Sequence, residues 1–257
     1  MTEDTRDEWT EHGWARVRDH AAPQPYVMRF VRAAEVDELY ALHLGVTARV
    51  HHPHAFRPDD RAFMEQQIEQ RGRTVGVFGA EGIVAYAAIS FPLDHDPDNL
   101  GRDLPVPSSE LCRVADYDGS AVHPDWRGNR LQQRMTDVRH RWALNHGRHH
   151  ILGTVSPFNP VSLQNFLALG CRVRNLKRKY GGMLRLIIYR DLRDPVPPAI
   201  DPGTILDIPL ADIERQESLF RRGFEGFALA DSAATPTLRC GLRAQSGRDD
   251  ETLAAAS

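Results

Sequence analysis

The order of hydrophobic and polar positions predicts alternating strands and helices over most of the 257-residue chain. Apolar residues two positions apart predict strands, and apolar residues three or four positions apart predict helices. On this basis strands are expected at 27–32, 74–78, 83–91, 111–122, 150–155, 171–176 and 184–192, and helices at 34–50, 58–71, 131–147 and 160–169. Hairpins at the front and one strand–helix–strand crossover in the middle predict a mixed α/β fold.

The two ends of the chain lack this regular pattern. Residues 1–25 are polar and end in Pro23-Gln24-Pro25, which predicts a flexible N-terminal arm before a main domain at 26–192. Residues 193–242 predict a small extension with a helix near 210–222 and strands at 226–230 and 237–242. The polar, alanine-rich residues 243–257 predict a disordered tail.

Composition excludes several classes of protein. Hydrophobic residues make up 41% of the chain and charged residues 26%, which is the globular range, and no apolar run of about 18 residues could span a bilayer. The net charge of −3 gives no overall attraction to nucleic acid. The acidic start of the chain lacks the order of a secretory signal, so we expect a cytoplasmic protein that binds neither nucleic acid nor membrane.

Cysteines and histidines do not stand at metal-binding spacings. The three cysteines, Cys112, Cys171 and Cys240, are odd in number and far apart, which predicts reduced thiols. The histidines at 51–54 and at 149–150 have no carboxylate or cysteine partner at a matching spacing, and we expect a polar loop and a helix-to-strand junction there. The sequence therefore predicts no metal.

The segment Arg127-Gly128-Asn129-Arg130-Leu131-Gln132 carries the clearest chemical signal. It lies between the strand ending at Val122 and a predicted helix, so the first-turn amides of that helix stay available to an anion. Gly128 lets the backbone approach a phosphate closely, and the two arginines add positive charge. A turn of this kind also occurs without a ligand.

Two sequence blocks resemble the GNAT superfamily of N-acyltransferases. The block from Val122 to Gln132 is similar to the acetyl-CoA signature of that family, and the block from Asn159 to Cys171 is similar to its later pattern of an asparagine, a small residue, an aromatic residue and a closing glycine. The resemblance implies a mostly antiparallel sheet with flanking helices, in which the fourth and fifth strands splay apart. It also implies that acetyl-CoA lies in the splay and is attacked directly by an amine.

The resemblance assigns the cofactor contacts to residues in both blocks. The fourth strand would bond pantetheine, the turn would hold the pyrophosphate, and the second block would contact the pantetheine arm from the other side. These expected acetyl-CoA contacts are Ala121, Val122, Arg127, Gly128, Asn129, Arg130, Leu131, Gln132, Asn159 and Phe166.

The sequence departs from the family pattern at three of these positions. Arg130 and Gln132 replace small residues, although right-handed helical backbone would suit an arginine. Phe166 stands where many relatives have a tyrosine that protonates the leaving thiolate. Tyr180 is our candidate for that acid, with an ordinary packed aromatic as the alternative.

A general base must accept a proton from the attacking amine. Asp118, together with Asp116, stands near the end of the fourth strand on the pleat face expected for Val122, and Glu110 stands at its start. Each is more typical of a solvated loop or edge acid than of a base. His123 is more typical of a turn residue than of a base.

These features predict an enzyme that transfers acetyl from acetyl-CoA to a primary amine of a small molecule or peptide. An acyl-CoA-binding regulatory module, favoured by Phe166, is the first alternative. An enzyme with a longer acyl donor or an acyl carrier protein is the second, for which the basic run 172–179 would offer a contact surface; protection of a sheet edge explains that run equally well. The C-terminal extension could cover the acceptor site or form a homodimer contact.

Overall fold

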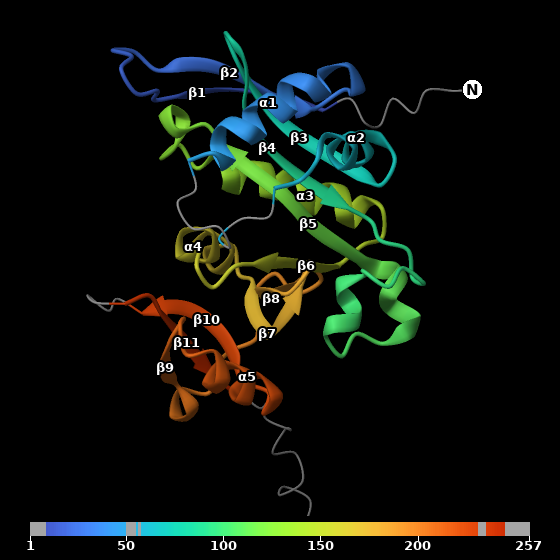
Figure 1. Ribbon diagram of the computed structural model, residues 1–257, viewed down its shortest axis with the longest axis vertical. Coiled ribbons are helices and arrows are strands. Elements are labelled where there is room, and N and C mark those ends of the chain that lie inside the picture. Colours follow the sequence, from blue (N-terminus) through green and yellow to red (C-terminus); the bar gives the residue numbers. More distant parts are fainter. Residues whose placement is uncertain (1–8, 50–54, 56–57, 231–234, 245–257) are drawn as a thin grey trace, which may run out of the picture.

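The computed structural model describes residues 9–49, 55, 58–230 and 235–244. In this part of the chain eleven strands form one sheet, in the order β1-β2-β3-β4-β5-β6-β8-β7-β10-β11-β9 (Figure 1). The strands are β1 (Thr10–Ala15), β2 (Gln24–Phe30), β3 (Gly72–Gly79), β4 (Gly82–Ser90), β5 (Val114–Val122), β6 (His150–Val155), β7 (Arg172–Lys179), β8 (Met183–Asp191), β9 (Leu206–Pro209), β10 (Glu225–Ala230) and β11 (Thr237–Gly241). Neighbouring strands are antiparallel, except that β5 and β6 are parallel.

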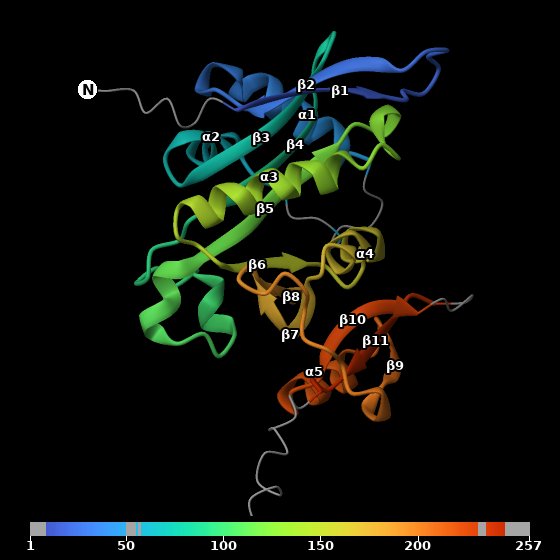
Figure 2. The ribbon, with the colours of Figure 1, turned by 180° about the vertical axis from the view of Figure 1, so that it is seen from behind.

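Helices cover both faces of the sheet. Helices α1 and α2 lie on one face, and α3 and α4 lie on the other, as the opposite views of Figures 1 and 2 show. The helices are α1 (Val36–Thr47), α2 (Arg61–Glu69), α3 (Leu131–Asn145), α4 (Pro160–Ala168) and α5 (Ile213–Arg221). None of the described helices has both the length and the apolar composition that crossing a bilayer requires.

The core consists of layers between these helices and the sheet. Leu39 of α1 and Ile68 of α2 pack with Tyr86 of β4, whereas Met135 of α3 packs with Val77 and neighbouring residues on the opposite face. A larger cluster joins α4, β6, β7, β8 and α5. Because apolar residues recur at helical or strand spacing in these segments, the sequence predicted most of these elements.

The N-terminal arm was predicted wrongly in part. Thr10–Ala15 form β1, which pairs with β2 along its full length, and β2 begins at Gln24, before the predicted boundary. In β1 only Ala15 is buried, so the strand shows little hydrophobic alternation that the sequence could reveal. Residues 1–8 lie outside the described residues.

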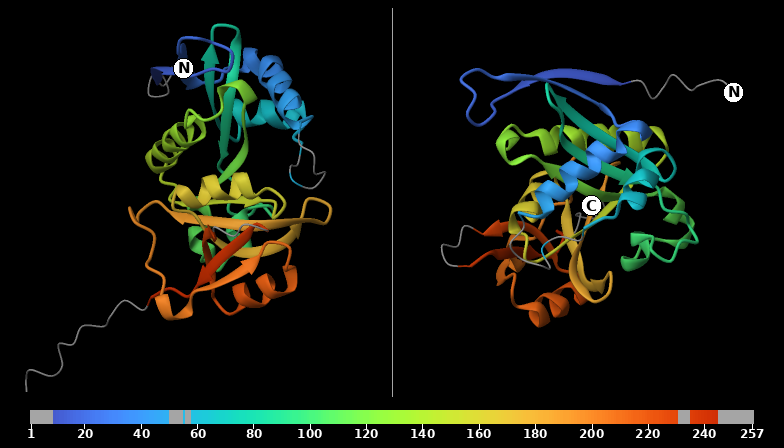
Figure 3. Two further views of the ribbon diagram at one scale, coloured as in Figure 1. Left: turned by 90° about the vertical axis from the view of Figure 1, so that its left-hand side faces the viewer. Right: turned by 45° about the horizontal axis from the view of Figure 1, so that its top comes forward.

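The C-terminal extension continues the main sheet. Gly226 of β10 pairs with Val173 of β7, and β11 lies between β10 and β9 (Figure 3). The predicted helix and two strands are present as α5, β10 and β11, while the four-residue β9 was not predicted. Arg243, placed in the predicted tail, forms a bridge with Ile200, and residues 245–257 lie outside the described residues.

Candidate active site

The parallel strands β5 and β6 separate halfway along their length. Their ladder runs from Val114 and His150 to Tyr117 and Gly153. Beyond this point β5 continues to Val122 beside β4, and β6 continues to Val155 beside β8. Figure 1 shows the two ribbons diverging towards the end from which α4 follows β6. The splay exposes backbone of both strands to the space between them.

A β-bulge in β5 lies at the start of the splay. Ala87 and Ile89 of β4 pair with Ser120 and Tyr117, so β5 has one extra residue between these pairs. The bulge releases the carbonyl of Ala88, and the fully buried guanidinium of Arg139 donates to that oxygen at 3.0 Å. An arginine on α3 therefore holds the bulge in place, since an unpaired buried carbonyl would be costly.

The bulge changes which face each β5 side chain reaches. Val122 packs with the α3 cluster, whereas Asp118 lines a small pocket with Phe63 and Met64 of α2. The expectation that Asp118 and Val122 share a face was therefore wrong, because the extra residue interrupts the alternation of the strand. Asp59 lies beside the bulge on the α2 side, where a Cβ at Gly119 would be 2.8 Å from its Oδ2.

Asp116 of β5 is a buried carboxyl two residues before Asp118. Its side chain is beneath the surface, and Oδ1 has no hydrogen-bond partner within the described part of the chain. Burial raises the pKa of Asp116 well above its usual range, and the negative charge of Asp118 raises it further, while the Leu100 amide and Lys179 oppose the shift. Such a group can carry a proton near neutral pH.

Tyr180 reaches the same region from the turn between β7 and β8. The residue has a left-handed φ of 52°, and its side chain hydrogen-bonds to Thr154 of β6 with Asp116 and Asp118 nearby. Burial raises the pKa of Tyr180, so its hydroxyl keeps its proton at neutral pH. The structure thus brings together Tyr180 and Asp118, two of the three residues predicted for catalysis.

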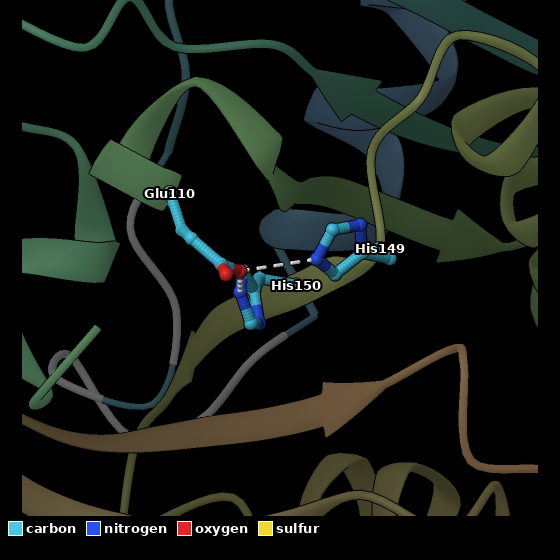
Figure 4. A group of neighbouring side chains, drawn as sticks. All are labelled: Glu110, His149 and His150. Carbon is cyan, nitrogen blue, oxygen red and sulfur yellow. Dashed lines mark hydrogen bonds and ion pairs between the residues drawn. The ribbon is translucent and has the colours of Figure 1, made fainter. Parts of the chain in front are cut away.

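Glu110 does not reach the splay. It lies in the short helix η4 (Ser108–Arg113), and its Oε2 is 2.6 Å from Nε2 of His150 and 3.3 Å from Nε2 of His149 (Figure 4). His150 is the first residue of β6, three residues before the strands separate. The predicted strand start at 111 is a 3₁₀ turn, which directs Glu110 to the other end of β5.

The predicted phosphate turn presents a row of available amides at the start of α3. Among the described residues, no acceptor bonds the backbone N–H groups of residues 128 to 133, and the first helical bond runs from Arg134 to the carbonyl of Arg130. Gly128 has φ 83° and Arg130 has φ 56°. The expectation of right-handed backbone at Arg130 was wrong, because this position keeps a conformation that glycine adopts more easily.

Side chains fix the turn from both sides. Asn129 accepts from the backbone N–H of Arg16 at 2.8 Å and donates to the Arg16 carbonyl at 2.8 Å, so the β1–β2 loop is attached to the turn. Oε1 of Gln132 accepts from Asn165 of α4 at 2.8 Å. Arg127 donates to the carbonyl of Val122 at 3.3 Å. The buried Leu131 and Ala121 pack into clusters on opposite faces of the sheet.

The second sequence block forms α4 as predicted. Asn159 caps the helix by accepting from the N–H of Ser162 at 3.1 Å, and Pro160 is the first helical residue. Phe166 is buried, and its ring centroid lies 5.2 Å from that of Tyr117. The aromatic side chain therefore points to the start of the splay without offering a hydroxyl.

Two further polar residues at the splay were not predicted as site residues. Tyr117 forms a short hydrogen bond with Nε2 of His140. Burial lowers the pKa of His140 to about 3, with contributions from the charges of Arg139 and Arg190, so its ring is neutral. Burial also raises the pKa of Tyr117 well above its usual range. No sequence signal links residues that are this far apart in the chain.

Further sequence predictions concern the cysteines and several histidines. Cys112, Cys171 and Cys240 are free thiols. His149 lies between α3 and β6 and His150 is the first residue of β6, as expected for a helix-to-strand junction. The histidines at 51–54 lie outside the described residues. His123 accepts from the N–H of Asp125 and so shapes the turn before η5 (Pro124–Trp126).

The fold is that of known GNAT acetyltransferases. No model of a known protein family matches the sequence, and no curated protein matches it. A GNAT-family acetyltransferase from Streptococcus pneumoniae aligns over 65% of this chain and 99% of its own, with 13% identity and a TM-score of 0.50. The predicted mixed, mostly antiparallel sheet with flanking helices is thereby confirmed.

Two further solved structures have similar values. A GNAT-superfamily phosphinothricin acetyltransferase from Sinorhizobium meliloti, in complex with acetyl-CoA, covers 65% of this chain and 88% of its own at 13% identity and a TM-score of 0.48. An N-acetyltransferase from Staphylococcus aureus covers 65% of this chain and 98% of its own at 12% identity and a TM-score of 0.48.

Proposed function

We propose that this protein transfers an acetyl group from acetyl-CoA to a primary amine. The observation that carries the proposal is the splay of β5 from β6 beside a helix N-terminus with six available amides. These N–H groups and the helix dipole are suited to the pyrophosphate of CoA. The pantetheine arm then lies in the splay between Val122 and Asn159, with its thioester next to the bulge.

The acceptor amine approaches from the α2 side of the sheet. Asp59 and Asp118 lie beside the bulge on this side and attract a cationic amine. Asp118 is the proposed base for the proton that the amine loses, because the neighbouring Asp116 already carries a proton near neutral pH.

The reaction is a direct transfer. The amine nitrogen bonds to the thioester carbon, the carbon–sulfur bond breaks, and the thiolate takes a proton. Tyr180 is the proposed donor of that proton, since its hydroxyl is protonated at neutral pH and hydrogen-bonds to Thr154 of β6 near Asp118 of β5. A backbone amide of β5 at the bulge polarises the carbonyl oxygen, so catalysis depends on position and on oxyanion stabilisation.

Phe166 favours one alternative function. A chain that keeps the cleft but has lost the usual proton donor could serve as an acyl-CoA-binding regulatory module. The second alternative, a longer donor or an acyl carrier protein, has less support. Lys177 and Lys179 pair with Asp103, Arg174 pairs with Glu225, and β7 lies between β8 and β10. Three of the five basic residues in the run therefore have an acidic partner, and the run is not an open sheet edge.

Calorimetry followed by an activity assay separates these functions. We expect acetyl-CoA to bind one site per chain, and thiol release to follow when a panel of primary amines is added. Tight binding without turnover on any amine would support the regulatory module. Preference for longer acyl-CoAs would support the second alternative, and absence of binding to every acyl-CoA would contradict all three.

A further inference from the structure

A second cluster of polar side chains lies at the far end of β5 from the splay. Glu110 of η4 and the consecutive residues His149 and His150 point to one another (Figure 4). One oxygen of Glu110 is 2.6 Å from Nε2 of His150 and 3.3 Å from Nε2 of His149, and the three ligand atoms lie within 4.8 Å of one another. Side chains of neighbouring residues normally alternate in a strand, so this convergence depends on the bend before β6.

The contacts of His150 determine which of its nitrogens faces Glu110. The hydroxyl oxygen of Tyr189 lies 2.9 Å from Nδ1 of His150. Nε2 of His150 is therefore the nitrogen that faces the carboxylate of Glu110, beside Nε2 of His149.

The donor set identifies the cation. Two imidazole nitrogens and one carboxylate oxygen are ligands that Zn²⁺ prefers, whereas Mg²⁺ and Ca²⁺ prefer oxygen alone. The bond from Nδ1 of His150 to Tyr189 matches the outer hydrogen bond that orients most metal-binding histidines. We propose that Glu110, His149 and His150 bind Zn²⁺, with water completing the coordination.

The surroundings of these three side chains allow Zn²⁺ to bind. The side chain of Glu110 is 36% exposed, so a hydrated ion can enter, while that of His150 is only 6% exposed and is firmly placed. Arg193 is the nearest cation, 3.9 Å from Glu110, but its closer partner is Asp191 at 2.6 Å. The charge of Arg193 lowers the affinity of the three residues for Zn²⁺, but its side chain does not block their ligand atoms. Bound Zn²⁺ would join η4 to the start of β6 and stabilise this end of the sheet.

The rival explanation is a hydrogen-bonded cluster without a metal. Both histidines would then donate from Nε2 to the carboxylate of Glu110. The two explanations therefore differ in whether the purified protein binds Zn²⁺.

Zn²⁺ binding by the full-length chain tests the proposal. We expect calorimetry and native mass spectrometry to find one Zn²⁺ per chain, a higher melting temperature with Zn²⁺, and no such effect with Mg²⁺. Glu110→Gln and His149→Gln should each weaken binding by tenfold or more. His95→Gln is the matched control, because His95 contacts a single carboxylate, Asp94, at the surface.

Two outcomes would overturn the proposal. One is the absence of stoichiometric Zn²⁺ binding to the wild-type chain. The other is binding that His149→Gln and His95→Gln weaken equally. Circular dichroism without metal shows whether each variant is folded, and Co²⁺ provides a second readout, since coordination by histidine nitrogen changes its visible absorption. None of these measurements depends on acetyl-CoA or on transferase activity.

Discussion

Arg130 occupies a backbone conformation that favours glycine. Its φ of 56° and ψ of 22° are left-handed, and this conformation lies at the point where the turn enters α3. Left-handed backbone costs a residue with a side chain about 1–2 kcal/mol, so the turn is held by its surroundings, which include Asn129. The position thus has a backbone typical of glycine although its residue is arginine.

Replacing Arg130 with glycine should raise the stability of the protein. We expect Arg130→Gly to increase the free energy of unfolding by up to about 1 kcal/mol, because the strain is larger than the entropy that glycine adds to the unfolded chain. Urea unfolding measures the change. Arg127→Gly is the control: Arg127 has φ −68°, so glycine there should lower stability. Equal changes in both variants would contradict the argument.

Tyr180 and Tyr117 place two hydroxyl groups at the same splay. Tyr180→Phe should lower turnover by about 10²-fold while acetyl-CoA affinity stays the same, because the variant removes only the proton for the leaving thiolate. Tyr117→Phe should change turnover much less, since its hydroxyl is committed to His140. Steady-state thiol release measures the turnover of both variants. A larger loss in Tyr117→Phe than in Tyr180→Phe would mean that Tyr117 protonates the leaving thiolate.

Asp116 gives the stability of the protein a specific pH dependence. Its folded pKa is raised above the unfolded value near 3.8, so the protein loses stability as pH rises from that value towards the folded pKa, by about 1.4 kcal/mol per pH unit for one proton. Asp116→Asn should remove this loss, and its stability relative to wild type should grow as pH rises above about 4. The charges that face this carboxyl are those of Asp96, Asp118 and Lys179.

Asp207 provides a control of opposite sign. The hydrogen bond from Arg239 lowers the pKa of Asp207, so its contribution is present at neutral pH and is lost as pH falls through the folded pKa. Urea unfolding of Asp116→Asn and Asp207→Asn across a pH series should therefore give opposite trends. Parallel trends would show that Asp116 is not a buried, proton-carrying acid.

At the scale of elements, the regular helices and central strands could be predicted because their apolar positions recur at fixed spacing. The start of β5, β1 and the four-residue β9 could not. Residues Ser108–Arg113 form a 3₁₀ turn in place of the predicted strand start, and this places Glu110 away from the splay. The bulge in β5 depends on Arg139 of α3, a partner that strand periodicity does not reveal.

In the candidate site, too, local features could be predicted from the sequence and long-range contacts could not. The turn before α3 and the cap of α4 follow from local sequence, so the local structure of residues 127–132 and of Asn159 could be predicted. Tyr180 was proposed because Phe166 lacks the hydroxyl that the resemblance led us to expect, and the contact of Tyr180 with Thr154 depends on how the β7–β8 turn folds back to β6. The pairing of Tyr117 with His140 joins residues from β5 and α3 and leaves no local trace.

Asn129 connects two elements that the sequence did not link. Asn129→Ala should lower the free energy of unfolding by about 1 kcal/mol, because both backbone groups of Arg16 lose their partner. Hydrogen exchange should become faster in β1 and remain unchanged in β10. Asn129→Asp, which keeps the acceptor but loses the donor, should fall between wild type and alanine. No change in β1 exchange would mean that its ladder with β2 holds it alone.

At the scale of the whole molecule, one sheet runs from the N-terminal β1 to the C-terminal β9. The strands before the splay carry the phosphate turn and the acidic side of the candidate site, and the strands after it carry the turn that supplies Tyr180. The C-terminal segment joins at Val173 and Gly226 and is reinforced by the buried Glu225, which pairs with Arg174 and Arg243. The sheet therefore links the proposed donor side, acceptor side and extension.

The central claim is that the splay and the adjacent turn bind acetyl-CoA. Hydrogen–deuterium exchange with and without acetyl-CoA tests it most directly, because the amides of residues 128 to 133 have no acceptor among the described residues. We predict that acetyl-CoA slows exchange at these amides and in residues 119–122, and that acetate, which lacks the pyrophosphate, does not. Exchange that stays unchanged there, or slows only in β9–β11, would contradict the claim.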